Sequence, residues 1–307
     1  MFKNEVSVLA PATVANVVCG FDIMGFALEE PNDLMTMRLI SEKSVKIIHQ
    51  DDFNLPCEPE KNVAGATLLA ILENIDDKIG FEIEITKKIK PGSGIGSSAA
   101  SAAGAAVAAN RLLNNRFSKL ELVEFAMCGE QVASGAKHAD NVAPAIFGGF
   151  TLIRSSNPLD VISIDFPPLF VTIVHPQIEV KTSDAREILK KQVSLKDAIE
   201  QWGNIAGLVA GLMKGDYQLI SRSLEDKIIE PTRSILIPEF DRIKSESKQA
   251  GALGGGISGS GPSIFMLSQT EEIARNVQSA IRRNYQSIGI EFNTYQTKIN
   301  PNGVEIM

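Results

Sequence analysis

The chain has 307 residues, of which 44% are apolar and 22% charged, a balance that excludes a disordered chain and suits one large or two closely packed globular domains. The net charge of -7 and the isoelectric point near 5.2 argue against nucleic acid as the main partner, because proteins that bind such polymers usually carry a basic face. A small anion can still bind in a local basic pocket.

Three cysteines, Cys19, Cys57 and Cys128, are odd in number and have no CxxC spacing, so the sequence predicts neither a disulfide framework nor a structural zinc site. The first residues lack a basic segment followed by a long apolar core, which argues against a signal peptide. No stretch reaches the roughly 18 apolar residues of a membrane span. We therefore expect a cytoplasmic protein with no membrane partner.

Alternation of apolar and polar residues predicts β-strands in the first part of the chain. They lie at 5–12, 34–40, 44–49 and 81–89. The last strand runs into a glycine-rich loop, and the alanine-rich, proline-free stretch that follows at 97–113 favours a helix. A further helix is predicted at 118–134.

Strands and helices also interleave in the second part of the chain. Strands are predicted at 148–154, 160–176, 262–268 and 290–299, and helices at 194–216 and 270–286. The residues alone thus indicate a mixed α/β or α+β protein. We expect two domains, 1–155 and 156–307, and close packing between them because no repeat or low-complexity linker separates them.

The stretch "PGSGIGSSAASAAG", Pro91 to Gly104, has the composition of a phosphate-binding loop but contains no lysine. Gly92, Gly94 and Gly96 let the backbone approach a ligand, and N–H groups at a helix start form an anion site that the helix dipole reinforces. The loop is neither a Walker A motif nor a GxGxxG dinucleotide motif. Its alternative interpretation is a tight turn that packs the alanine-rich helix against the sheet.

Two other stretches combine close-approach glycines with small polar residues beside a predicted strand. They are "APATVANVVCGFDIMG" from Ala10 and "GGGISGSGPSIFML" from Gly254. With the glycine loop between them, the three motifs resemble those of the GHMP kinases, a family named for galactokinase, homoserine kinase, mevalonate kinase and phosphomevalonate kinase. The resemblance covers the chain from end to end.

Within that family the first motif is most similar to the homoserine kinase branch, and "KHADNVAPAIFGG" and "TSDAREIL" agree with it. The matching positions of the first motif are Asn16, Gly20, Asp22 and Gly25. One departure is the run from Val17 to Gly20, where the family more often has leucine-glycine-proline-glycine.

The resemblance implies an α+β fold with two domains. The N-terminal α/β domain would contain a left-handed βαβ unit, the C-terminal domain would be a ferredoxin-like α/β sandwich, and the active site would lie between them. Family members of this type are commonly dimers, so we expect a homodimer.

The resemblance also implies that ATP and Mg²⁺ bind at the glycine loop. ATP would contact Asn62 and Val63 on the adenine side, and along the loop Pro91, Gly92, Ser93, Gly94, Ile95, Gly96, Ser97 and Ser98. Ser98 and Glu130 would be the magnesium ligands, and a helix N-terminus with a bound cation would replace the absent lysine. Without the resemblance, Ser98 is interpreted as a helix N-cap and Glu130 as part of a solvated helix face.

The expected acceptor is a zwitterionic amino acid, L-homoserine, whose carboxylate and ammonium need opposite partners. The resemblance places Arg186 and Arg233 at the carboxylate, with Thr182 one helical turn before Arg186. It places these further residues around the acceptor: Asn16, Asp22, His138, Asp140 and Gly259. The ordinary alternatives are surface salt bridges for the arginines and a structural role for the histidine.

The catalytic group is expected among Asn141, Asp22 and Asp140. Several GHMP kinases have an aspartate near the acceptor hydroxyl, but the matching residue here is Asn141, and an amide cannot take a proton at neutral pH. We therefore expect transfer without a protein base at that position. The alternative is that Asp140 or Asp22 serves as the base.

The function expected from the resemblance is ATP-dependent phosphorylation of L-homoserine in threonine biosynthesis. One alternative is another small-molecule GHMP kinase, acting on mevalonate, a diphosphocytidyl alcohol or shikimate. A second is a catalytically silent relative that binds a small molecule.

Overall fold

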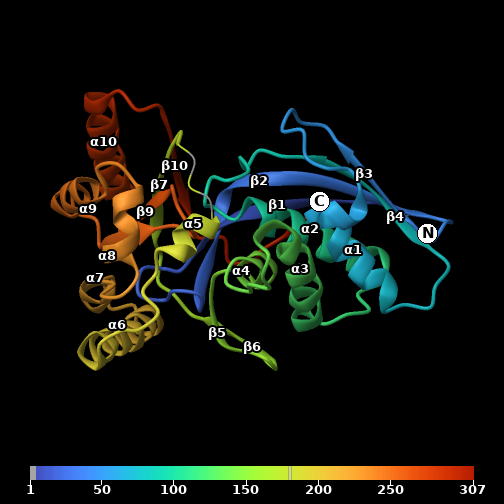
Figure 1. Cartoon of the computed structure of the whole chain (residues 1–307), viewed down its shortest axis with the longest axis horizontal. Helices are drawn as coiled ribbons and strands as arrows, with labels where there is room; N and C mark the ends of the chain where they lie inside the picture. Colours follow the sequence, from blue (N-terminus) through green and yellow to red (C-terminus); the bar gives the residue numbers. More distant parts are fainter. Residues whose placement is uncertain (1–4, 179, 181) are drawn as a thin grey trace.

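The computed structural model describes residues 5–178, 180 and 182–307, and it contains two halves side by side (Figure 1). A seven-stranded sheet occupies the N-terminal half, with the order β11-β1-β2-β4-β3 and with β5 and β6 continuing from β2. Its strands are β1 (Glu5–Ala15), β2 (Met24–Ile40), β3 (Val45–His49), β4 (Gly80–Thr86), β5 (Phe150–Ser156), β6 (Leu159–Ile164) and β11 (Glu305–Ile306). All strands predicted before residue 90 are confirmed.

The helix α1 (Val63–Glu73) connects β3 to β4, which are parallel neighbours, so these three elements form the expected βαβ unit. The helices α1, α2 (Ser97–Leu112) and α3 (Lys119–Ser134) gather on one face of the sheet (Figure 1), and α4 (Val142–Phe147) follows them. A short 3₁₀ helix, η1 (Pro59–Lys61), precedes α1.

Small side chains let α2 lie very close to the sheet. Nearly every residue of α2 is buried, and most of these are alanine. A Cβ atom added to Gly104 would lie 2.6 Å from the Met35 sulfur and 2.9 Å from the Ala10 Cβ. The alanine-rich composition therefore fixes the depth at which the start of α2, and with it the glycine loop, sits on β1 and β2.

The C-terminal half is built on a four-stranded antiparallel sheet with the order β10-β7-β9-β8. Its elements are β7 (Phe170–Pro176), α5 (Thr182–Glu187), α6 (Leu195–Lys214), α7 (Tyr217–Ser223), α8 (Glu230–Arg233), η2 (Ser234–Leu236), α9 (Phe240–Gln249), β8 (Gly254–Ile257), β9 (Ile264–Ser268), α10 (Glu271–Ile288) and β10 (Phe292–Lys298). The strand order and the alternation of strands with helices are those of a ferredoxin-like sandwich. The predicted two-domain α+β fold is confirmed.

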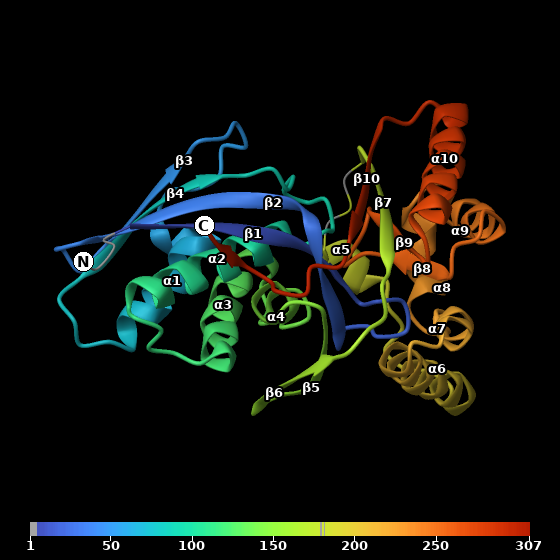
Figure 2. The same ribbon diagram turned by 180° about the vertical axis from the view of Figure 1, so that it is seen from behind.

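The expected domain boundary at 155 and 156 falls inside β5, whose hairpin with β6 still belongs to the N-terminal sheet. The chain also returns to that sheet after β10, where β11 pairs with β1 (Figure 2). We therefore propose that the C-terminal domain runs from the segment 165–169 to the end of β10, and that the remainder completes the N-terminal domain.

Overpacking tests the close approach of α2 to the sheet. We expect Gly104→Leu to lower the free energy of unfolding by on the order of 1–3 kcal/mol, because the added side chain would collide with Met35 and Ala10, which are both completely buried. Arg111→Leu, at an exposed position of the same helix, should change it by no more than about 0.5 kcal/mol. Urea denaturation measures the free energy of unfolding of both variants, and equal values for the two would contradict the packing argument.

Candidate active site

A cavity of about 420 Å³ lies where the two halves meet, and residues from all three sequence motifs line it. The predicted residues on its wall are Asn16, Asp22, Asn62, Val63, Pro91, Gly92, Gly94, Gly96, Ser97, Ser98, Glu130, His138, Asp140, Asn141, Arg186, Arg233 and Gly259. Ser93 and Ile95 are instead buried within the glycine loop. Thr182 begins α5, but its side chain lies outside the described residues.

The glycine loop is held between the two halves of the protein. Gly92, Gly94 and Gly96 all have positive φ, between 68° and 81°, as the sequence predicts. The Ser258 hydroxyl donates to the Gly94 carbonyl over 2.8 Å, and the Ser263 hydroxyl donates to the Ser93 carbonyl over 2.6 Å. These bonds use loop carbonyls on the side of the C-terminal half, and Gly96, Ser97 and Ser98 at the start of α2 line the cavity, where a helix N-terminus can bind an anion.

Lys87 is a residue of the cavity that the sequence did not single out. Its ammonium is buried and donates to the Asp33 carboxylate, to the Ser97 carbonyl over 3.0 Å and to the Ser101 hydroxyl over 2.9 Å. All three ammonium hydrogens thus have protein acceptors. In the sequence it looked like one of several lysines at the end of a strand, and only its burial distinguishes it.

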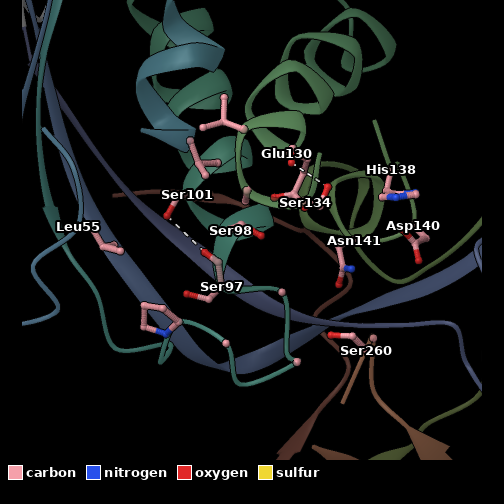
Figure 3. Close-up of a pocket in the computed structure, with 18 of the residues that line it drawn as sticks. Leu55, Ser97, Ser98, Ser101, Glu130, Ser134, His138, Asp140, Asn141 and Ser260 are labelled. Carbon is pink, nitrogen blue, oxygen red and sulfur yellow. Dashed lines mark hydrogen bonds between the residues drawn. The ribbon is translucent and has the colours of Figure 1, made fainter. Parts of the chain in front are cut away.

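Ser98 and Glu130 lie together on one wall of the cavity, and Ser260 lies on the other side (Figure 3). Burial raises the pKa of Glu130 to about 7, although a hydrogen bond from Ser98 and the charge of Lys87 oppose this rise. The Oε1 atom of Glu130 is buried with no hydrogen-bond partner among the described residues. An unpartnered carboxylate oxygen beside a hydroxyl suits a hard cation, so these two residues fit the predicted magnesium site.

The far end of the cavity concentrates opposite charges. Arg186 donates to both carboxylate oxygens of Asp22, over 2.7 and 3.3 Å. Arg233 is 3% exposed and donates to the carbonyls of Ala185 and Gly259. Burial and the nearby charge of Arg186 lower the pKa of Arg233 to about 10, so it stays charged at neutral pH.

Phe21 is a second residue that the sequence reasoning missed. Its ring lies 5.7 Å from the Arg186 guanidinium and 4.8 Å from that of Arg233, which are cation–π distances. The ring therefore holds two like charges close together at the cavity. Its position directly before Asp22 in the first motif is the one signal that could have identified it.

The first motif adopts an unusual left-handed turn. Asn16, Val17, Val18 and Asp22 all have positive φ, and Val18, at 59°, stands where the family more often has glycine. The Asn16 side chain closes this turn, because its oxygen accepts from the Asp22 N–H and its nitrogen donates to the Gly259 carbonyl. The departure from the family pattern is therefore accommodated without displacing Asp22 from the cavity.

Asp140 and His138 occupy the wall beside Asp22. Burial raises the pKa of Asp140 to about 7, and the charges of Asp22 and Glu130 add to the rise. Burial and the charge of Arg186 lower the pKa of His138, so this ring is neutral at pH 7.

Both polar atoms of the Asn62 side chain already have partners in the protein. Its oxygen accepts from the Gly65 N–H, which caps α1, and its nitrogen donates to the Pro56 carbonyl and contacts the His49 ring nitrogen. The Asn62 backbone is also used, since its N–H donates to the Pro59 carbonyl and its carbonyl accepts from the Ala66 N–H. A contact from Asn62 to adenine is thus left to the remaining lone pairs of its two oxygens. Asn141 is placed at the start of α4 beside Gly96 of the glycine loop, and its oxygen accepts a hydrogen bond from Thr13.

Two family models match the chain: the N-terminal domain of GHMP kinases at residues 62–149 and the C-terminal domain of GHMP kinases at residues 208–287. A homoserine kinase of Chloroherpeton thalassium is 46% identical over an alignment of 298 positions that covers 93% of this chain and 93% of that one. The chain therefore belongs to the GHMP kinase family, and among its members to the homoserine kinases.

Solved structures agree with this assignment. The crystal structure of homoserine kinase from Cytophaga hutchinsonii has a TM-score of 0.95 and 48% sequence identity, covering 100% of this chain and 98% of that one. A mevalonate kinase from L. major, solved with R-mevalonate, has a TM-score of 0.72 at 16% identity and shares the fold alone.

The raised pKa of Asp140 predicts a pH-dependent gain in stability on substitution. Between its ordinary pKa of 3.8 and about 7, Asp140 binds a proton in the folded state but not in the unfolded state. The free energy of unfolding therefore falls as the pH rises across this range to about 7. We expect Asp140→Asn, which mimics the protonated acid, to raise the Tm at pH 8 by about 2–5 °C, or roughly 1–2 kcal/mol. The gain should be smaller at pH 5 and should disappear below about pH 4, where both states hold the proton.

Asp22→Asn is the matched control in the same thermal unfolding measurement. Since it removes the carboxylate that neutralises Arg186, it should bring no gain at either pH. An Asp140→Asn protein that is no more stable than the wild type at pH 8 would argue against an unfavourable buried charge.

Proposed function

We propose that this protein transfers the γ-phosphoryl group of ATP to the side-chain hydroxyl of L-homoserine, giving O-phospho-L-homoserine for threonine biosynthesis. The observation that carries the proposal is a single cavity with a glycine loop and a helix N-terminus at one end and paired charges of both signs at the other. The identity to homoserine kinases over most of the chain supports it.

The nucleotide would bind with its phosphates against the glycine loop and the start of α2, and with its base near Asn62 and Val63. The residues for a magnesium ion would be Ser98 and Glu130, and the ion would neutralise charge on the phosphates. Among the described residues no cluster of three or more His, Cys, Asp or Glu could hold a metal by itself. This is consistent with a cation that is bound jointly with phosphate.

The acceptor would lie between the charged groups of the opposite end. Its carboxylate would contact Arg186 and Arg233, and its ammonium would face Asp22 and Asp140. An ammonium beside Asp140 would favour the ionised form of that buried acid, which is unfavourable in the free protein. The neutral His138 would complete this end as a hydrogen-bonding group.

The chemistry would proceed without a protein base at Asn141. The acceptor oxygen bonds to the γ-phosphorus, the bond from that phosphorus to the bridging oxygen breaks with its electrons left on ADP, and the hydroxyl proton passes to an oxygen of the transferred group. A loose transition state needs little activation of the nucleophile, so correct placement carries most of the catalysis.

The alternatives are less well supported by the charges in the cavity. Mevalonate, a diphosphocytidyl alcohol and shikimate carry no ammonium, so Asp140 would stay without a cationic partner. A catalytically silent relative would be free to lose Ser98 or Glu130, whereas both face the cavity here. An ADP-release assay with homoserine and these three alcohols tests the assignment, and release that is not specific to homoserine would overturn it.

A homodimer and a cytoplasmic location stay predictions. In the described part of the chain, no helix combines the length and apolar character needed to cross a bilayer.

Loss of either predicted cation ligand should abolish magnesium-dependent turnover. We expect Ser98→Ala and Glu130→Gln to lower kcat by about 100-fold or more, because each removes one oxygen ligand from an ion that neutralises phosphate charge. The fold should be retained by circular dichroism. Ser118→Ala, at the N-cap of α3 outside the cavity, is the control and should keep wild-type kcat. Normal transfer in both cavity variants would refute the assignment.

Loss of Arg186 or Arg233 should weaken the binding of homoserine far more than the binding of ATP. We expect Arg186→Ala and Arg233→Ala to raise the KM for homoserine by at least about 30-fold, the equivalent of about 2 kcal/mol or more. The KM for ATP should change by less than about threefold, since both side chains would contact the carboxylate of the acceptor and not the phosphates. Arg154→Ala, on the surface of β5, serves as the control. An equal loss of ATP affinity would place the arginines in the nucleotide site.

A further inference from the structure

A buried hydroxyl on β1 contacts the amide at the start of α4. Thr13 is completely buried, and its Oγ1 donates to the Asn141 Oδ1 over 2.8 Å, although the two residues are 128 positions apart. Asn141 lines the cavity, and its amide nitrogen has no protein acceptor among the described residues. The side chain therefore turns its oxygen to the protein and offers its two N–H groups to a ligand.

The surroundings of Thr13 favour this orientation of the amide over the opposite one. A threonine hydroxyl can accept as well as donate, so a rotated Asn141 could donate its N–H to Thr13. Its hydroxyl hydrogen would then be buried without an acceptor, because Asn141 is its one acceptor in the described part of the chain. A buried donor without a partner is unfavourable, and the orientation with the oxygen toward Thr13 avoids it.

Thr13 also contacts the glycine loop. Its backbone N–H donates to the Ile95 carbonyl over 3.1 Å, and a Cβ atom at residue 96 would collide with its hydroxyl. Gly96, which directly precedes α2, is thus required for the hydroxyl to reach Asn141. Thr13 therefore sets the position of the Asn141 amide relative to the loop that would hold the phosphates.

We propose that Thr13 is a positioning residue that keeps the Asn141 N–H₂ group aimed at the reacting oxygens. This inference rests on the proposed kinase function and adds to it the direction of one hydrogen bond. Asn141 donates to a lone pair of the acceptor hydroxyl, so the hydroxyl hydrogen is left to point at the phosphoryl oxygen that receives it. The reversed amide would offer its carbonyl to that hydrogen and hold it away from the phosphoryl group.

The test compares two substitutions of similar size. Thr13→Val removes the hydroxyl, and we expect kcat at saturating homoserine to fall about 10- to 100-fold, as for a misplaced catalytic group. The KM for ATP should stay within about twofold, because the loop backbone bond to Ile95 is kept. Thr13→Ser keeps the hydroxyl and should retain kcat within about threefold.

A double-mutant cycle separates positioning from general damage to the fold. In an Asn141→Ala background, Thr13→Val should change kcat by less than about twofold, since the amide that it orients is gone. An equal loss of kcat in both backgrounds, or a Thr13→Ser enzyme as slow as Thr13→Val, would overturn the inference. If thermal melts show that Thr13→Val is not folded, Thr13→Ala takes its place in the same cycle. A wild-type protein that does not phosphorylate homoserine would instead overturn the proposed function.

Discussion

The buried ion pair between Lys87 and Asp33 is the interaction on which the nucleotide end of the cavity depends. Neither charge could remain there alone, because each is almost completely removed from water. Asp33 also accepts from the backbone N–H groups of Lys88 and Ile89, while Lys87 donates to the first turn of α2. Strand β2, the entry to the glycine loop and α2 are thereby fixed as one unit. The lysine that the loop itself lacks lies just before it, and its task is to hold the loop in shape.

At the end of the cavity proposed for homoserine, by contrast, the protein compensates the buried charges only partly. Asp22 already neutralises Arg186, whereas Asp140 is buried without such a partner and tends to keep its proton. A ligand with a cation and an anion a few atoms apart can complete both sets of interactions at once. A ligand with one charge leaves part of the cavity unfavourably buried, which is a physical basis for selectivity that needs no tight steric fit.

The sequence predicted the architecture well because strand alternation and helix composition are local properties. The strand at 262–268 and the helix at 270–286 are present as β9 and α10 with nearly the same bounds. By contrast, β8 is mostly glycine and β11 has two residues, so neither carries an alternation to detect. The three motifs also met at one cavity as expected. What could not be predicted were the partners of single polar groups, such as Thr13 with Asn141 or Asn62 with Gly65 and His49, because these depend on how distant segments approach one another.

The return of the chain to β1 bears on the order in which the protein can assemble during synthesis. Beyond β10, Val304 donates to the Ala145 carbonyl of α4, Gly149 donates to Asn300, and β11 extends the first sheet. When the strands of the first sheet up to β6 have been synthesised, the segment that packs on α4 has therefore not yet been made. α4 is the helix that begins next to Asn141. The N-terminal half can collapse early, but the wall of the cavity that holds the acceptor-side amide becomes fully supported only when residues 299–306 emerge.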